Sequence, residues 1–306
     1  MAMAILITST PQDALIAKHL SQLLETSFVS LAITTYASGE FYVEASEILT
    51  GQTVILFHHT SFPLSEGILK LLLSMNAIRH RKPERLIVIV PYLPYSRQDR
   101  SRNSGSAIGA KVVAQILETS YPDTLMVLDI HSLTTLDHFN FPTINLTAAS
   151  LIAEDIKRYF KLSDICLISP DAGGIGRVQK IAELLDVPYT ALSKERLDSG
   201  DLIIHSSQAL PSQKTYIFVD DMIDTGSTLL VASQACRGKK LHVYATHGLF
   251  SSKTSFQNLT TCFESITVTD SLPQHYSAAN FRIIPCWDVF VSEMKLRASS
   301  LNLCNL

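Results

Sequence analysis

Short apolar, β-branched runs alternate along the chain with stretches whose apolar residues recur at helical spacing. The expected strands cover residues 53–57, 85–90, 125–130, 165–169, 216–219 and 241–246. Buried strands that alternate with amphipathic helices are typical of proteins in which helices flank a largely parallel sheet. The pattern therefore predicts an α/β fold.

Three helical stripes are expected between these strands, and we interpret each as a core face rather than a ligand surface. The stripes are Ile68, Leu71, Leu72, Met75 and Ile78; Val112, Val113, Ile116 and Leu117; and Ile175, Val178, Ile181, Ala182 and Leu185. Each half of the chain carries strand, loop, long helix, strand, polar loop and strand in a similar order. With 306 residues, which suits two cores better than one, this predicts two similar domains, 1–145 and 146–306, with the last residues packing back on the first.

Composition narrows the class of protein. Hydrophobic residues make up 46% and the formal net charge is −3, so no basic field recruits nucleic acid or an acidic membrane. The five cysteines form no C-x-x-C pair, which indicates reduced thiols. Neither a signal peptide nor a run of the roughly 20 apolar residues of a membrane helix is found in the sequence. A cytoplasmic enzyme is expected.

Carboxylates and small hydroxyl residues follow one another directly after the strand expected at 216–219. They are Asp220, Asp221, Asp224, Thr225, Gly226, Ser227 and Thr228. We expect them on a loop between a strand end and a helix start, the edge at which such sheets bind ligands. Backbone N–H groups, hydroxyls and the helix dipole suit a phosphate, whereas the acids suit sugar hydroxyls or a cation. A sugar phosphate satisfies both halves better than a simple capped helix, which needs fewer acids.

Polar groups also follow two strands of the first half. Arg97, Gln98 and Asp99 come after residues 85–90 and can meet a polyphosphate and a base, although such a run is usually a surface salt-bridge cluster. Asp129 and His131 end the strand expected at 125–130. Residues two apart on a strand face the same side, so the pair is expected to project together toward a ligand.

Two further segments of the second half carry charged groups. Asp171 follows the strand at 165–169 and precedes two glycines, which suits a Mg²⁺ site completed by substrate phosphates, or else an ordinary strand-to-helix turn. Lys194 and Arg196 lie in a polar stretch expected to be a loop, where such a pair is usually solvated surface.

Several segments carry a resemblance to known families, among them residues 36–40, YASGE, which resemble the F-x-N/D-GE segment of ribose-phosphate pyrophosphokinases. Residues 219–228, VDDMIDTGST, resemble the phosphoribosyl-pyrophosphate (PRPP) motif shared by phosphoribosyltransferases, which consume PRPP, and ribose-phosphate pyrophosphokinases, which make it. Residues 91–100, PYLPYSRQDR, resemble the PY-x-x-Y-x-RQDR segment that the pyrophosphokinases have and ordinary phosphoribosyltransferases lack. The D-I-H at 129–131 and the SPD-x-G at 169–173 are similar to motifs of the same family.

The resemblance implies an enzyme that transfers the pyrophosphoryl group of Mg²⁺-ATP to ribose 5-phosphate, giving PRPP and AMP. It implies two type I phosphoribosyltransferase-like domains, the first on the ATP side, Mg²⁺ as cofactor, and a dimer-based homo-oligomer. The implied ATP-binding residues are Tyr36, Ser38, Glu40, Arg97, Gln98, Asp99 and His131, and the metal-binding residues are His131 and Asp171. Those for ribose 5-phosphate are Asp220, Asp221, Asp224, Thr225, Gly226, Ser227 and Thr228, and Lys194 and Arg196 are implied as catalytic.

The chain departs from the family pattern at a few positions. Ser38 replaces the amide or acid expected to read adenine, and Thr134 and Asp137 replace Gln and Gly. Residues 101–111 carry only Arg102 before Lys111, closer to the shorter archaeal-type form. We therefore interpret the chain as a divergent member. The alternatives are a PRPP-binding transferase or regulator, which needs no ATP site, and a non-catalytic paralogue that assembles with an active synthase.

Overall fold

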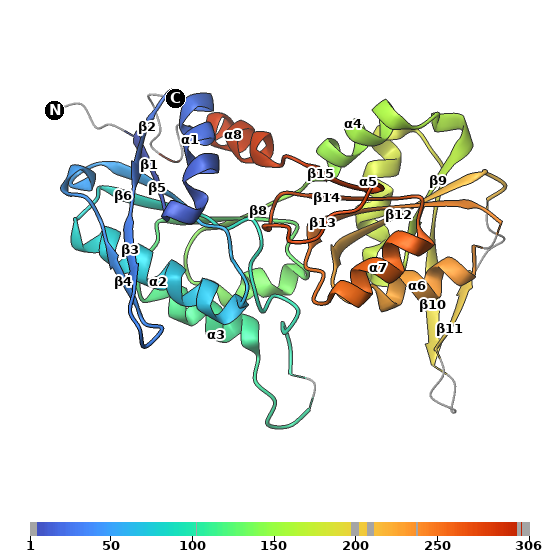
Figure 1. Ribbon diagram of the computed structural model, residues 1–306, viewed down its shortest axis with the longest axis horizontal. Coiled ribbons are helices and arrows are strands. Elements are labelled where there is room, and N and C mark those ends of the chain that lie inside the picture. The colour runs from blue at the N-terminus through green and yellow to red at the C-terminus, as the bar shows by residue number, and fades with distance from the viewer. Residues whose placement is uncertain are drawn as a thin grey trace. The chain divides into compact units, whose positions relative to one another are not determined.

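The computed structural model describes residues 5–101, 103–196, 202–206, 211–236, 238–298 and 301, with the backbone alone at 193–196 and 202–206. Contacts divide the chain into two units, Met1–Leu146 with Trp287–Leu306, and Thr147–Cys286. Each unit is built around a mainly parallel sheet flanked by helices (Figure 1), which confirms the expected α/β fold class.

Within its described residues, the first unit has a six-stranded sheet in the order β2-β1-β5-β6-β7-β8, and every neighbouring pair is parallel. The strands are β1 (Ile5–Ser9), β2 (Ser27–Ser30), β5 (Thr53–Phe57), β6 (Arg85–Ile89), β7 (Thr124–Leu128) and β8 (Thr143–Leu146). The helices are α1 (Ala14–Leu23), α2 (Leu64–His80), α3 (Gly109–Glu118) and α8 (Trp287–Leu296). A separate antiparallel hairpin, β3 (Ala32–Thr35) and β4 (Phe41–Glu44), packs on α2.

Alternation along the strands explains how this sheet is covered on both faces. In β5 all five residues are buried, as expected for a strand between two helical layers. Val54 and Leu56 join the core formed with α2 and α3, whereas the Phe57 ring packs edge-on against Trp287 of α8. Figure 1 shows α1 beside α8, and these two helices are in contact.

Two of the three expected helical stripes are core faces, and in the third only two of the four expected residues are buried. In α2 four of the five stripe residues are buried and Leu72 is partly buried, and in α5 four of the five are buried. In α3, Val113 and Leu117 are buried, but Val112 and Ile116 are 46% and 38% exposed. The small residues Gly109, Ala110 and Ala114 complete the buried face of α3, so Val112 and Ile116 fall about 100° around the helix from it.

The second unit has a seven-stranded sheet among its described residues, in the order β11-β10-β9-β12-β13-β14-β15. The strands are β9 (Ile165–Ser169), β10 (Tyr189–Arg196), β11 (Leu202–Ser206), β12 (Thr215–Ile223), β13 (Lys240–Gly248), β14 (Ser265–Thr269) and β15 (Phe281–Ile284). The pairs are parallel except β10 with β11. The helices are α4 (Ala149–Tyr159), α5 (Ile175–Leu185), α6 (Ser227–Gln234) and α7 (Lys253–Cys262).

Strand β12 is longer than expected and corrects one prediction. It pairs with β9 only as far as Phe218, opposite Ile168, but with β13 as far as Ile223. Asp220 and Asp221 therefore lie on the strand, not on the following loop as the polar composition suggested. The hydrogen bonds to β13 hold this polar segment extended, so pairing overrides the turn propensity of the aspartates.

A buried polar cluster occupies the carboxyl edge of the first sheet. Asp13, in the 3₁₀ turn after β1, is 2% exposed and accepts hydrogen bonds from the His59 backbone N–H at 3.1 Å and the Thr10 hydroxyl at 3.2 Å. The His59 Nδ1 lies 3.6 Å from the carboxylate, and its ring packs on Trp287. Burial raises the pKa of Asp13 to about 7, against the smaller opposing effect of these hydrogen bonds.

Replacement of this carboxyl group should change the pH dependence of stability. The folded pKa of Asp13 lies above that of the unfolded chain, so its protonated form stabilises fully below about pH 4. That contribution is lost as the pH rises through 7, at up to about 1.4 kcal/mol per unit. Urea unfolding between pH 4 and 8 should show this relative decline against Asp13→Asn but not against Asp137→Asn, an exposed carboxylate of the same unit. Parallel curves for all three proteins would contradict it.

Candidate functional site

The turn between β12 and α6 has the geometry of an anion-binding loop. Gly226 has φ +70° and precedes the first residue of α6, whose N-terminal N–H groups have no partner within the helix. Thr225 and Ser227 are exposed, and the Thr225 hydroxyl lies 3.2 Å from that of Ser227. Gly226 itself is buried, and a Cβ there would lie 2.5 Å from the Leu259 side chain on α7. The position therefore requires glycine for its backbone conformation and for space.

The two acids on β12 share one basic partner that the sequence analysis missed. The Nη1 atom of Arg177, in the first turn of α5, lies 3.8 Å from Asp220 and 3.9 Å from Asp221. Burial raises the pKa of Asp220 well above its usual value, the charge of Asp221 adds to this, and Arg177 opposes it. The sequence signal was an arginine within the first turn of the helix that follows Asp171.

Asp171 is placed by the turn that ends β9. Its side chain caps the 3₁₀ turn at Ala172–Gly174 by accepting hydrogen bonds from the backbone N–H groups of Gly173 and Gly174 at 3.1 and 3.2 Å. The Ser169 hydroxyl donates to the Asp171 carbonyl at 2.6 Å. The expected strand-to-helix turn is present, with the Asp171 carboxylate fixed at its start.

Lys194 and Arg196 lie at the end of β10, which pairs antiparallel with β11. This segment was expected to be a loop, and its backbone is a strand as far as Arg196. The side chains of both residues lie outside the described part of the chain, as do residues 197–201 entirely. Their catalytic role remains a prediction.

In the first unit, Asp99 is held by residues after β7. Its carboxylate accepts a hydrogen bond from Thr134 at 3.0 Å, and His138 Nε2 lies 3.1 Å from its carbonyl oxygen. Burial raises the pKa of Asp99, but hydrogen bonds from Ser132 and Thr134 outweigh this and lower it. Thr134, a departure from the family pattern, thus forms a hydrogen bond directly to the RQDR segment.

Arg97 and Gln98 are exposed beside Asp99. The Gln98 side chain lies against Gly109 at the start of α3, where a Cβ would be 2.6 Å from its Oε1. Gln98 also lines a pocket of about 350 Å³ with Arg100, Ser106 and Ala107. Gly109 is a second residue that the sequence analysis missed.

The expected alternation of Asp129 and His131 is wrong. Strand β7 ends at Leu128, and Asp129 has φ +39°, outside the range of a strand. The Asn145 side chain accepts a hydrogen bond from the Ile130 N–H, which fixes the turn. Asp129 is buried and His131 is exposed, so the two side chains do not project as a strand pair.

Tyr36, Ser38 and Glu40 lie on the turn of the β3–β4 hairpin. The Tyr36 side chain is 52% exposed and is available to stack on a flat ring. The Ser38 hydroxyl donates to the Glu40 carboxylate at 2.9 Å, so the serine orients the acid.

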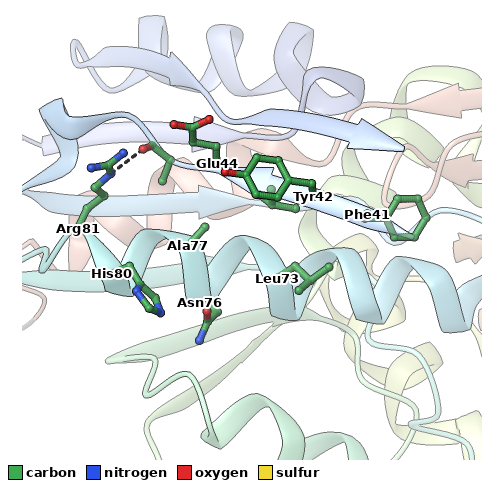
Figure 2. Close-up of a pocket in the computed structure, with 10 residues that line it drawn as sticks. Phe41, Tyr42, Glu44, Leu73, Asn76, Ala77, His80 and Arg81 are labelled. Carbon is green, nitrogen blue, oxygen red and sulfur yellow. Dashed lines mark hydrogen bonds between the residues drawn. The ribbon is translucent and has the colours of Figure 1, made fainter. Parts of the chain in front are cut away.

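A groove of about 510 Å³ beneath the same hairpin holds none of the predicted site residues. Figure 2 shows residues that line it, among them Tyr42 and Glu44 on β4 and Leu73 and Ala77 on α2, with the Arg81 guanidinium bonded at 2.7 Å to the Ala45 carbonyl. No group of three or more His, Cys, Asp or Glu side chains suited to a metal ion occurs in the described part of the chain. None of its helices combines the length and apolar character needed to span a bilayer.

A mainly parallel sheet with a small-residue loop after a central strand, preceded by paired acids, is typical of phosphoribosyl-type α/β proteins, and the family matches agree with this class. Three family models match the chain. They are the N-terminal domain of ribose phosphate pyrophosphokinase at residues 5–120, the phosphoribosyl transferase domain at 142–250, and the phosphoribosyl synthetase-associated domain at 211–297.

Curated relatives agree with these matches. A ribose-phosphate pyrophosphokinase of Bradyrhizobium diazoefficiens is 32% identical, with 88% of this chain and 87% of the relative covered. A ribose-phosphate pyrophosphokinase of Methanopyrus kandleri is 30% identical, with 89% of this chain and 94% of the relative covered. The fold is similar to that of the phosphoribosylpyrophosphate synthetase of Mycobacterium smegmatis, with TM-score 0.86, 24% identity, and 98% and 99% of the two chains covered. The chain belongs to the ribose-phosphate pyrophosphokinase family.

Substitution of Gly226 should destabilise the second unit more than substitution of a glycine that has a left-handed backbone but open space where a Cβ would lie. In Gly226→Ala the new residue would have a left-handed backbone and its Cβ would collide with Leu259, so the free energy of unfolding should fall by about 2–5 kcal/mol. Gly238→Ala is the matched control, with φ +80° and open space around the Cβ, and should cost about 1–2 kcal/mol. Urea unfolding followed by circular dichroism measures both, and equal losses would contradict the packing argument.

Proposed function

We propose that this protein transfers the β,γ-pyrophosphoryl group of Mg²⁺-ATP to the anomeric hydroxyl of ribose 5-phosphate. The hydroxyl oxygen forms a bond to the β-phosphorus, and the bond from that phosphorus to the oxygen bridging to the α-phosphorus breaks. The electron pair leaves with AMP, the hydroxyl proton is released, and the products are PRPP and AMP.

One observation carries this proposal. The model for the N-terminal pyrophosphokinase domain and the model for the phosphoribosyl transferase domain match successive parts of the same chain. A phosphoribosyltransferase, or a regulator built on the same loop, would account for the second match and leave the first unexplained.

The second unit is proposed to bind ribose 5-phosphate. Thr225, Gly226, Ser227 and Thr228, with Asp224 beside them, suit the 5-phosphate, because N–H groups and hydroxyls converge at the start of α6. Asp220 and Asp221, the two acids on β12, suit the ribose hydroxyls, since carboxylates accept hydrogen bonds from neutral donors.

The first unit is proposed to bind the nucleotide. Arg97, Gln98 and Asp99 would lie along it, and Tyr36, Ser38 and Glu40 would reach the adenine of a neighbouring subunit, which requires a homo-oligomer. The exposed Tyr36 ring supports this role. A cytoplasmic location is part of the same proposal.

We propose that His131 in the first unit and Asp171 in the second each serve as a Mg²⁺ ligand alongside substrate. The Asp171 carboxylate is an oxygen ligand of the type that Mg²⁺ prefers, and its capping bonds fix its position. The described residues offer no complete metal cage, so substrate phosphates and water would supply the other ligands. The ion would neutralise phosphate charge, whereas Lys194 and Arg196 would stabilise charge on the transferred group.

The reaction itself is the first test. Protein, Mg²⁺, ATP and ribose 5-phosphate should yield AMP and PRPP in equal amounts by phosphorus NMR, and a chelator should stop the reaction. Orthophosphate concentration should be varied in the same experiment. Absence of AMP at every phosphate concentration would overturn the proposal in favour of a regulator or a non-catalytic paralogue.

Lys194→Ala should lower kcat by about 10²-fold or more while the KM values change little, because the lysine would act on charge that develops in the transition state. Lys180→Ala, at an exposed lysine on α5, is the control and should retain the parent rate. Unchanged kcat in Lys194→Ala would remove the residue from the catalytic group.

A further inference from the structure

Arg177 lies beside the part of β12 that extends beyond the end of β9. The pairing of β9 with β12 ends at Phe218, and the chain then turns through Ala172–Gly174 into α5. This turn and α5 both contact β12. The third residue of the helix is Arg177, so the end of β9 delivers a guanidinium to the segment of β12 that carries Asp220 and Asp221.

The two carboxylates need such a partner. They are consecutive and partly buried, with side chains 21% and 6% exposed, so their mutual repulsion is weakly screened. Burial is the larger cause that raises the pKa of Asp220, and Asp221 is the second. Within the described part of the chain, the charged groups that act on Asp220 are Asp221 on its own strand and Arg177 on α5. Of these two the arginine favours the ionised form, as does the Asp221 backbone N–H, which donates to Asp220 at 2.9 Å.

The geometry differs from that of a structural ion pair. In the same unit, Arg282 donates to both oxygens of the buried Asp155 at 2.7 and 2.9 Å, a close fork that occupies the carboxylate. Arg177 instead lies 3.8 and 3.9 Å from one oxygen of each of two acids, beyond hydrogen-bond distance. It therefore supplies charge to both carboxylates without using their lone pairs in a close fork.

We propose that Arg177 is a positioning residue for the sugar, which holds Asp220 and Asp221 together and favours their charged form as acceptors for two ribose hydroxyls. This inference rests on the proposed function, because it takes the sugar of ribose 5-phosphate as the ligand of the acids. A merely structural arginine would affect stability alone, whereas a positioning arginine controls the pH range in which the acids accept hydrogen bonds.

The test compares Arg177→Gln, Arg177→Lys and the control Arg158→Gln, which alters an exposed arginine of α4 in the same unit. Arg177→Gln should raise KM for ribose 5-phosphate at least tenfold at neutral pH and leave kcat and KM for ATP within about threefold. Because loss of the arginine favours protonated Asp220, the acid limb of kcat/KM for ribose 5-phosphate should move to higher pH. Arg177→Lys should restore most of the difference.

A second measurement needs no turnover. With carboxyl ¹³C-labelled aspartate, NMR titration should show the Asp220–Asp221 pair taking up a proton at higher pH in Arg177→Gln than in the parent, with no such change in Arg158→Gln. If the parent makes no AMP, the proposed function fails, while this titration and calorimetric binding of ribose 5-phosphate still test the arginine. An unmoved titration, or a loss confined to KM for ATP, would overturn the proposal.

Discussion

Strand β12 extends past the end of its neighbour β9, and the candidate sugar-phosphate site depends on this overhang. Hydrogen bonds to β13 keep the strand extended through Ile223, so Asp220 and Asp221 are held on a rigid element. On the other side, β9 has already ended at Ser169, and the turn that begins with Asp171 and leads into α5 occupies the vacated position. One difference in strand length thus brings together two acids, an arginine and the start of the phosphate loop.

The two units share a strand order, but the corresponding loops differ in what they expose. The orders β2-β1-β5-β6-β7-β8 and β10-β9-β12-β13-β14-β15 correspond, so the segment after β5 matches the phosphate loop after β12 in topology. After β5 the first unit places His59 in a closed cluster with Asp13 and Trp287, all three nearly inaccessible to solvent. The loop after β12 keeps Thr225 and Ser227 exposed. A duplicated fold therefore presents a sugar-phosphate loop in the second unit, while the first closes the corresponding edge with its own side chains.

Sequence patterns predicted the fold because its strands are short, apolar and bounded by polar turns. They predicted β5 and β9 to the residue. They failed where pairing or backbone conformation overrides local composition. Asp220 and Asp221 read as loop because the hydrogen bonds of β13 are invisible in the sequence, and the left-handed Asp129 broke an alternation assumed from β-branched neighbours. Arg177 was missed because its partners lie more than 40 residues away, a separation that no local pattern spans.

The amide NMR spectrum of the protein during titration with ribose 5-phosphate tests the location of the sugar-phosphate site most directly. If the phosphate binds at the start of α6, the N–H signals of Gly226, Ser227 and Thr228 should shift strongly and saturate at one ligand per chain, because a charged acceptor strengthens those hydrogen bonds. The signal of His59, in the corresponding segment of the first unit, should stay in place. Saturable shifts confined to the first unit, or no saturable shift at residues 226–228, would contradict the account.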